Sequence, residues 1–171
     1  LEQRAFVQVV QALGEPARNL IAIRISNPDD DVARVALSIC IDANVKEGGP
    51  VLSGALARPA LKRLAVRAAG VLEAKDAVSA LLPLCANADR LLALNAIVAC
   101  AQIGDETAYE TAAALLRSPD LPIRKAALAL MAKFPARALA TARGLMTDAD
   151  EKVVSVERIP DDGEDEDGNG G

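Results

Sequence analysis

Carboxylates and thiols are the side chains that could do chemistry in this chain, because the sequence contains no histidine. Without an imidazole there is no Ser-His or Cys-His pair and no His metal ligand. Adjacent carboxylates occur at Asp29 to Asp31 and at Asp105 with Glu106, but they lie at expected helix starts, where capping of exposed backbone amides is the simpler role. Phosphate-cradling glycine loops are missing as well. We therefore expect a non-catalytic protein without a cofactor or metal site.

Three cysteines, Cys40, Cys85 and Cys100, are each flanked by apolar residues. An odd number without paired spacing argues against a disulfide framework and against a zinc site. We expect buried core residues in a reducing cytoplasm, with a reactive thiol as the alternative. No apolar run approaches the roughly 20 residues that span a bilayer, and the first residues do not resemble a signal peptide. These features predict a cytoplasmic protein that has no membrane partner.

The negative charge of the chain is concentrated at its C-terminus. Of 19 basic and 24 acidic residues, six acids and no base lie in residues 161–171, so residues 1–160 have a net charge of 19 − 18 = +1. A nearly neutral body with 2% aromatic residues offers neither a strong phosphate-attracting field nor stacking platforms, so we expect no nucleic-acid binding. The acidic, glycine-rich tail is expected to be disordered. Three roles are open for it: added solubility, docking on a basic partner, or folding back over arginines of the concave face.

A recurring phrase defines the elements that must position these side chains. It reads "SNPDDDVARVAL" from residue 26, "ANADRLLALNAI" from 86, "RSPDLPIRKAAL" from 117 and "MTDADEKVVSVE" from 146, with a weaker "LARPALKRLAVRAA" from 56. The spacing of about 30 residues predicts five repeats. Four of the phrases carry an aspartate three positions before an aliphatic residue, as a helix N-cap does: Asp29, Asp89, Asp120 and Asp150. A shorter break in the middle of each unit predicts two helices of about ten to fourteen residues per repeat.

The repeats resemble HEAT-like helical repeats, particularly the bacterial repeats found in phycobilin-lyase-type proteins. The resemblance rests on "DLPIRKAALALM" (120–131), "LKRLAVRAAGVLEAKDAVSALLPL" (61–84) and "LNAIVACAQIGDETAYETAAALL" (94–116). It implies an all-α, armadillo-like solenoid of about five hairpins, wound into a right-handed superhelix over residues 1–160, with residues 161–171 as a disordered acidic tail. Residues 151–159 resemble the first helix of a sixth repeat, although a strand is also compatible with their valines.

The resemblance also implies a protein-interaction scaffold or adaptor whose second helices line the concave face of the solenoid. The candidate partner contacts are polar residues of those helices, with the single tyrosine as an amphipathic anchor, and plain solvated positions are the alternative: Arg18, Arg24, Tyr109, Glu110, Arg137 and Arg143. As in related repeats, arginines near the turns of the first helices are expected to bond to an aspartate of the adjacent repeat, with ligand binding as the alternative: Arg63, Arg67 and Arg124.

The partner is expected to be a protein of unknown identity, and pairing of two copies through the solenoid ends is open. Two other functions also remain open. One is an accessory subunit of a lyase-type or other modifying enzyme, and the other is a regulatory or spacer segment of a longer polypeptide.

Overall fold

The structure, a computed structural model, describes residues 2–12, 14–141 and 143. The chain divides into two compact units, of which the first ends at Phe134 and the second begins at Pro135. The first unit contains α1 (Glu2–Ala12), α2 (Gly14–Arg24), α3 (Asp30–Ala43), η1 (Lys46–Val51), α4 (Leu52–Ala57), α5 (Lys62–Val71), η2 (Lys75–Ala77), α6 (Val78–Leu81), η3 (Leu82–Ala86), α7 (Arg90–Ile103), α8 (Ala108–Leu115) and α9 (Leu121–Met131). In the second unit, residues 135–141 are helical.

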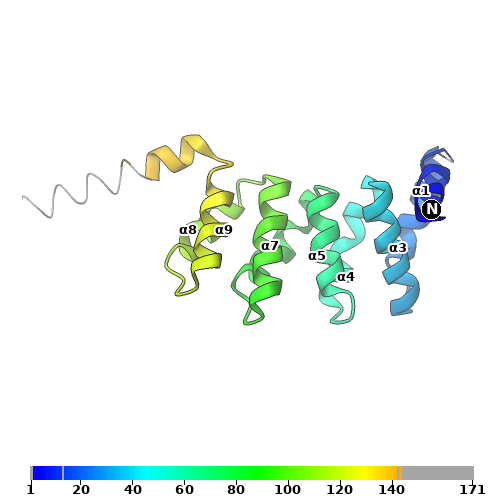
Figure 1. Ribbon diagram of the computed structural model, residues 1–171, viewed down its shortest axis with the longest axis horizontal. Helices are drawn as coiled ribbons and strands as arrows, with labels where there is room; N and C mark the ends of the chain where they lie inside the picture. The colour runs from blue at the N-terminus through cyan, green and yellow to red at the C-terminus, as the bar shows by residue number, and fades with distance from the viewer. Residues whose placement is uncertain (1, 13, 142, 144–171) are drawn as a thin grey trace, which may run out of the picture. The chain divides into compact units, whose positions relative to one another are not determined.

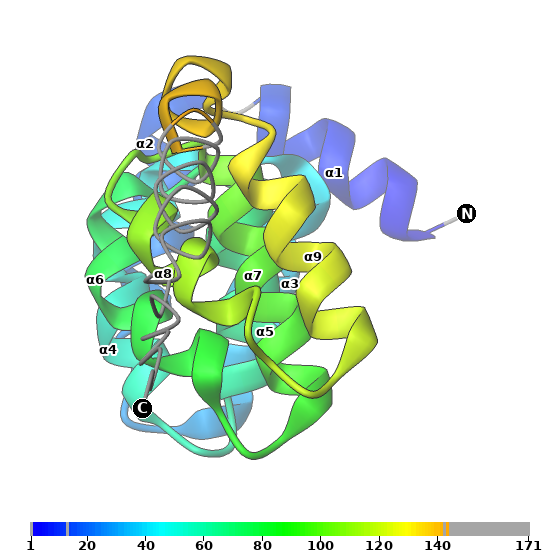
Figure 2. The same ribbon diagram turned by 90° about the vertical axis from the view of Figure 1, so that its left-hand side faces the viewer.

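The helices of the first unit lie in two rows (Figure 2). The first row contains α1, α3, α5, α7 and α9, and each member contacts the next; α3 to α9 lie side by side in Figure 1. The second row contains α2, α4, α6 and α8 with their 3-10 segments. A first-row helix and the second-row segment that follows it form a hairpin, so α1 to α8 make four hairpins and α9 begins a fifth. The predicted all-helical solenoid is confirmed, and the described residues contain no strand.

Some expectations concern features that the described residues do not test. The right-handed winding of the solenoid stays a prediction. The cap at Asp150, the segment 151–159, the tail 161–171 and the boundary after residue 160 all lie outside the described residues.

The recurring aspartates cap the first-row helices as predicted. Asp29 Oδ1 accepts hydrogen bonds from the Asp31 and Val32 amides at 2.8 and 3.4 Å. Asp89 accepts from two amides at the start of α7, and Asp120 accepts from the Ile123 amide at the start of α9. All three caps have extended backbone. A side-chain acceptor here satisfies amides that have no partner inside the helix. The start of α5, which follows the weaker phrase, has no side-chain cap.

The first-row helices are also followed by equivalent residues. Gly14, Asn44, Glu73 and Gly104 have positive φ values of 75°, 52°, 52° and 67° and are separated by 30, 29 and 31 residues. This left-handed conformation stops a helix and costs glycine nothing, whereas other residues adopt it rarely. The repeat therefore has a second marker besides the aspartate cap, at the turn inside each hairpin.

The second row is less regular than predicted. The prediction of two helices of about ten to fourteen residues per repeat describes the first hairpin. In the second hairpin, however, the second-row segment is split into η1 and α4, and in the third hairpin it is split into η2, α6 and η3. That expectation is wrong for these hairpins. Pro50 lies inside η1 and Pro83 at the start of η3, and proline lacks the amide that a continuous α-helix needs.

The core of the first unit is built from small and aliphatic side chains, and no polar or charged side chain is buried among the described residues. The three cysteines are buried and free, as predicted. Small residues let the helices approach closely: a Cβ added at Gly70 of α5 would lie 3.0 Å from Ala99 Cα of α7. Among the helices described, none is long and apolar enough to cross a membrane.

Candidate interaction surface

The two predicted contact residues of α2 have different surroundings. Arg18 is half-buried and its Nε lies 2.6 Å from Oε1 of Glu47 in η1. The hydrogen bond from Arg18 holds the pKa of Glu47 below its usual value. This pair therefore joins the first hairpin to the second. Arg24, the last residue of α2, is exposed.

The predicted surface position of Tyr109 is wrong. Its side chain is only 3% exposed, and its ring packs edge-on against Phe134, with 6.2 Å between the ring centroids and 81° between the planes. Ala108 and Ala112 of the same helix are also buried. This face of α8 therefore packs into the core where α8 contacts α9, and the aromatic ring is part of that core. Glu110, the next residue, is exposed.

Arg137 and Arg143 belong to the second unit, where Arg137 is half-buried and Arg143 is exposed. In the first unit, the other predicted contacts are divided between α2 and α8, the first and fourth hairpins, so they do not form one cluster. The role of Arg18, Arg24, Glu110 and the two arginines of the second unit in partner binding stays a prediction.

Arginines bridge neighbouring repeats along the edge formed by the inter-repeat turns. Arg63 Nη2 lies 2.7 Å from Oδ2 of Asp89, which confirms the predicted pairing of Arg63. The Leu92 amide and Arg63 together hold the pKa of Asp89 below its usual value. One repeat further on, Arg90 Nε lies 2.6 Å from Oδ2 of Asp120.

Neither the bridge of Arg90 nor a third bridge, formed by Arg58 in the turn after α4, was predicted. Arg58 is paired with Asp30, and its Nη1 donates a hydrogen bond to the Asn27 carbonyl at 2.6 Å. For Arg124 the predicted pairing with an adjacent repeat is wrong, since it donates to the Ser118 carbonyl of its own preceding turn at 2.7 Å. Arg67 is exposed and lines a cleft between α5 and α7.

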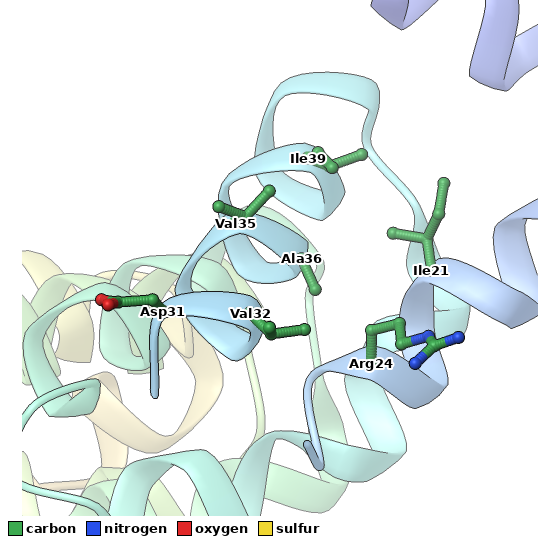
Figure 3. A pocket seen from close by; sticks show the side chains of 7 residues that line it. All are labelled: Ile21, Arg24, Asp31, Val32, Val35, Ala36 and Ile39. Carbon is green, nitrogen blue, oxygen red and sulfur yellow. The ribbon is translucent and has the colours of Figure 1, made fainter. Parts of the chain in front are cut away.

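An apolar groove with a volume of about 450 Å³ lies between α2 and α3 (Figure 3). Its aliphatic lining comes from Ile21 of α2 and from Val32, Val35, Ala36 and Ile39 of α3. The α3 residues recur at helical spacing and form one stripe along the helix. This stripe is solvent-exposed in part, since Val35 is 59% exposed.

Two charged residues stand at the ends of the groove lining. Asp31 points away from α2 in Figure 3 and is paired with Arg34 at 2.6 Å. Arg24 stands on the α2 side, and no ion pair of its side chain is found among the described residues. Large exposed aliphatic residues continue along α2, where Leu20 and Ile23 are each 64% exposed. The repeat pattern predicts a buried Val32, because Val32 has the same place in the repeat as the buried Leu92 of α7 and Ile123 of α9.

All three thiols are buried. Burial raises the pKa of Cys40 to about 11, with a smaller contribution from Glu47. Cys85 and Cys100 have their sulfur atoms 4.0 Å apart, and this contact together with burial raises the pKa of Cys85, whereas the same contact lowers the pKa of Cys100. A protonated, buried thiol is a poor nucleophile. Within the part of the chain that the structure describes, no group of three or more Cys, Asp or Glu side chains could hold a metal ion.

Comparison with known proteins agrees with the architecture. Residues 49–132 match the family model for HEAT repeats, a stretch that runs from η1 to just past α9. None of the curated proteins compared with the chain matches it. The match is to HEAT repeats in general, so the narrower phycobilin-lyase-type subgroup stays a prediction. Stacked hairpins with recurring caps, together with this match, make the chain a HEAT-like repeat protein.

Proposed function

We propose that this chain is a non-catalytic protein-interaction scaffold that binds a partner protein through the groove between α2 and α3. The observation that carries the proposal is the aliphatic lining of that groove at the surface of a helical-repeat unit. HEAT repeats commonly act as interaction scaffolds, because stacked hairpins present extended surfaces with little need for rearrangement.

The distribution of polarity in the first unit supports an interaction surface. Within its described interior, no buried side-chain nitrogen or oxygen atom is without a hydrogen-bond partner. The hydrogen-bonding needs of the interior are therefore met within the unit. By contrast, Val35 in the groove lining is 59% exposed, and Leu20 and Ile23 on α2 are each 64% exposed. Contiguous apolar surface rimmed by charge is typical of protein-binding sites.

The proposed surface overlaps only in part with the residues predicted from sequence. Arg24 belongs to both sets, whereas Arg18 is engaged with Glu47 and Tyr109 is buried. No feature of the described residues favours an accessory role in a lyase-type or modifying enzyme, so that alternative has only the resemblance behind it.

Capture of partners by three forms of the full chain tests the proposal. The wild type is compared with Val35→Glu in the groove and with Leu91→Glu on α7; these two positions are 59% and 54% exposed, so both variants should keep the stability of the wild type to within about 0.5 kcal/mol. We expect a protein that is retained in stoichiometric amount by the wild type and by Leu91→Glu but not by Val35→Glu. Equal retention by Val35→Glu would exclude the groove, and the absence of any stoichiometric protein would overturn the scaffold function.

A further inference from the structure

Two positions of the groove lining are more exposed than their equivalents in later repeats of the first unit. Three residues after the helix cap, Val32 of α3 is 39% exposed, whereas Leu92 of α7 and Ile123 of α9 are 5% and 6% exposed. Ten residues after the cap, Ile39 is half-buried and Leu130 of α9 is fully buried. The equivalents are buried because α7 packs against α5 and α9 packs against α7.

The helix that precedes α3 in the row is α1, and its surface explains why the groove stays open. Gly70 of α5 lies three residues before Glu73, the residue with positive φ that follows this helix. Because Gly70 has no side chain, α5 can approach Ala99 of α7 closely. At the same place α1 has Gln11, which is exposed, as is Gln8 one turn earlier. A long amide side chain prevents such an approach, and Figure 2 shows α1 tilted away from the row.

We infer that the groove binds an amphipathic α-helix of the partner protein, which packs on α3 as α5 packs on α7. This inference rests on the proposed scaffold function and specifies the kind of partner. The ends of the stripe, Val32 and Ile39, are seven residues apart, or about 10 Å at 1.5 Å per residue. It therefore receives about two turns of helix, whose aliphatic side chains recur at i, i+3 or i+4, and i+7.

Charge specifies a further property of the helix. Arg24 stands exposed on the rim, whereas Asp31 is already paired with Arg34. A helix with a glutamate or aspartate beside its aliphatic stripe complements this arrangement. A second copy of the chain offers a less suitable charge, because the exposed Leu128 of α9 has Lys125 one turn before it, with the same charge as Arg24.

The test uses a stapled helical peptide of about 14 residues with leucines at i, i+4 and i+7 and one glutamate beside them. A second peptide has lysine in place of the glutamate, and a third has the same composition in scrambled order. Binding to the full chain is measured by fluorescence anisotropy. The chain is used as wild type, Val35→Glu, Arg24→Glu and, as the matched control, Leu91→Glu.

We expect the glutamate peptide to bind the wild type and Leu91→Glu equally and Val35→Glu at least about 10-fold more weakly. Arg24→Glu should weaken the glutamate peptide by about 3- to 5-fold and should strengthen the lysine peptide, as a rim charge pair does. Equal binding of the scrambled peptide, or no response to Val35→Glu, would overturn the inference. A dimer in sedimentation velocity that Val35→Glu abolishes would assign the groove to a second copy and would also overturn it.

The two proposals fail in different ways. If neither helical peptide binds but capture of a protein still depends on Val35, the scaffold function stands and the helical partner is wrong. If no protein is captured at all, the scaffold function falls whatever the peptides do.

Discussion

Gly70→Ala is the substitution that tests most directly how closely the first-row helices pack. Alanine is favoured over glycine in a helix interior by about 1 kcal/mol, so helix propensity alone predicts a more stable protein. At this position, however, the new Cβ would lie 3.0 Å from Ala99 Cα and 3.2 Å from Ala99 Cβ. Carbon atoms prefer a separation of about 3.5 to 4.0 Å, so α5 and α7 must move apart.

The steric effect should outweigh the gain in propensity. Overpacking a core contact costs about 1 to 3 kcal/mol, and the atom in the way is backbone, which cannot rotate aside. We expect the free energy of unfolding to fall by about 1 kcal/mol or more, and the melting temperature to fall by about 2 to 4 °C for each kcal/mol. Urea titration followed by circular dichroism measures the first quantity, and thermal melting measures the second.

Gly54→Ala is the matched control. Gly54 lies in α4, and a Cβ added there meets nothing within 4 Å. This variant should gain about 0.5 to 1 kcal/mol, so the two identical substitutions should change stability in opposite directions. The reasoning is refuted if Gly70→Ala is as stable as Gly54→Ala. If Gln102→Ala restores the stability of Gly70→Ala, then the Gln102 side chain, 2.1 Å from the added Cβ, is the cause and not the helix approach.

Two further predictions concern a helix cap and a buried thiol. Asp120→Ala should lower the free energy of unfolding by about 1 kcal/mol, because Asp120 accepts a hydrogen bond from the Ile123 amide and pairs with Arg90. Asp120→Asn keeps a side-chain acceptor for this amide, so it should lose less than half as much stability. Equal losses for the two variants in urea titration would contradict the capping role. Stability should also fall between pH 9 and pH 11, because the Cys40 thiol ionises near pH 9 in the unfolded chain and at about 11 in the folded one. Below pH 9 the thiol is protonated in both states and its contribution, at most about 2 to 3 kcal/mol, is fully present. The urea midpoint of Cys40→Ala should therefore depend less steeply on pH above 9 than that of the wild type, and parallel curves would contradict the prediction.

The architecture was predictable because the signals that specify it are local. An aspartate three residues before an aliphatic residue caps a helix whatever surrounds it, and Asp29, Asp89 and Asp120 all do so. The split second-row segments were less predictable, since Pro50 and Pro83 were present in the sequence but proline is also tolerated in the first turn of a helix.

The surface could not be predicted in the same way, because burial depends on how neighbouring helices pack. Tyr109 was expected outside as an isolated polar aromatic residue, yet the small residues Ala108 and Ala112 on its helix face already indicated a buried stripe. Val32 has the sequence environment of a buried residue, and its exposure follows from the tilt of α1. In the sequence, only the long polar side chains of Gln8 and Gln11 indicate this tilt.

The burial of Tyr109 has a practical consequence for spectroscopy. The chain has one tyrosine and no tryptophan, so its tyrosine emission comes from this ring alone, in the fourth hairpin beside Phe134. Circular dichroism, by contrast, averages over every helix. Coincident unfolding curves from the two signals would mean that the hairpins melt as one cooperative block, and separated curves would mean that one end of the stack melts on its own. The emission therefore serves as a natural reporter for the end of the row that lies away from the groove.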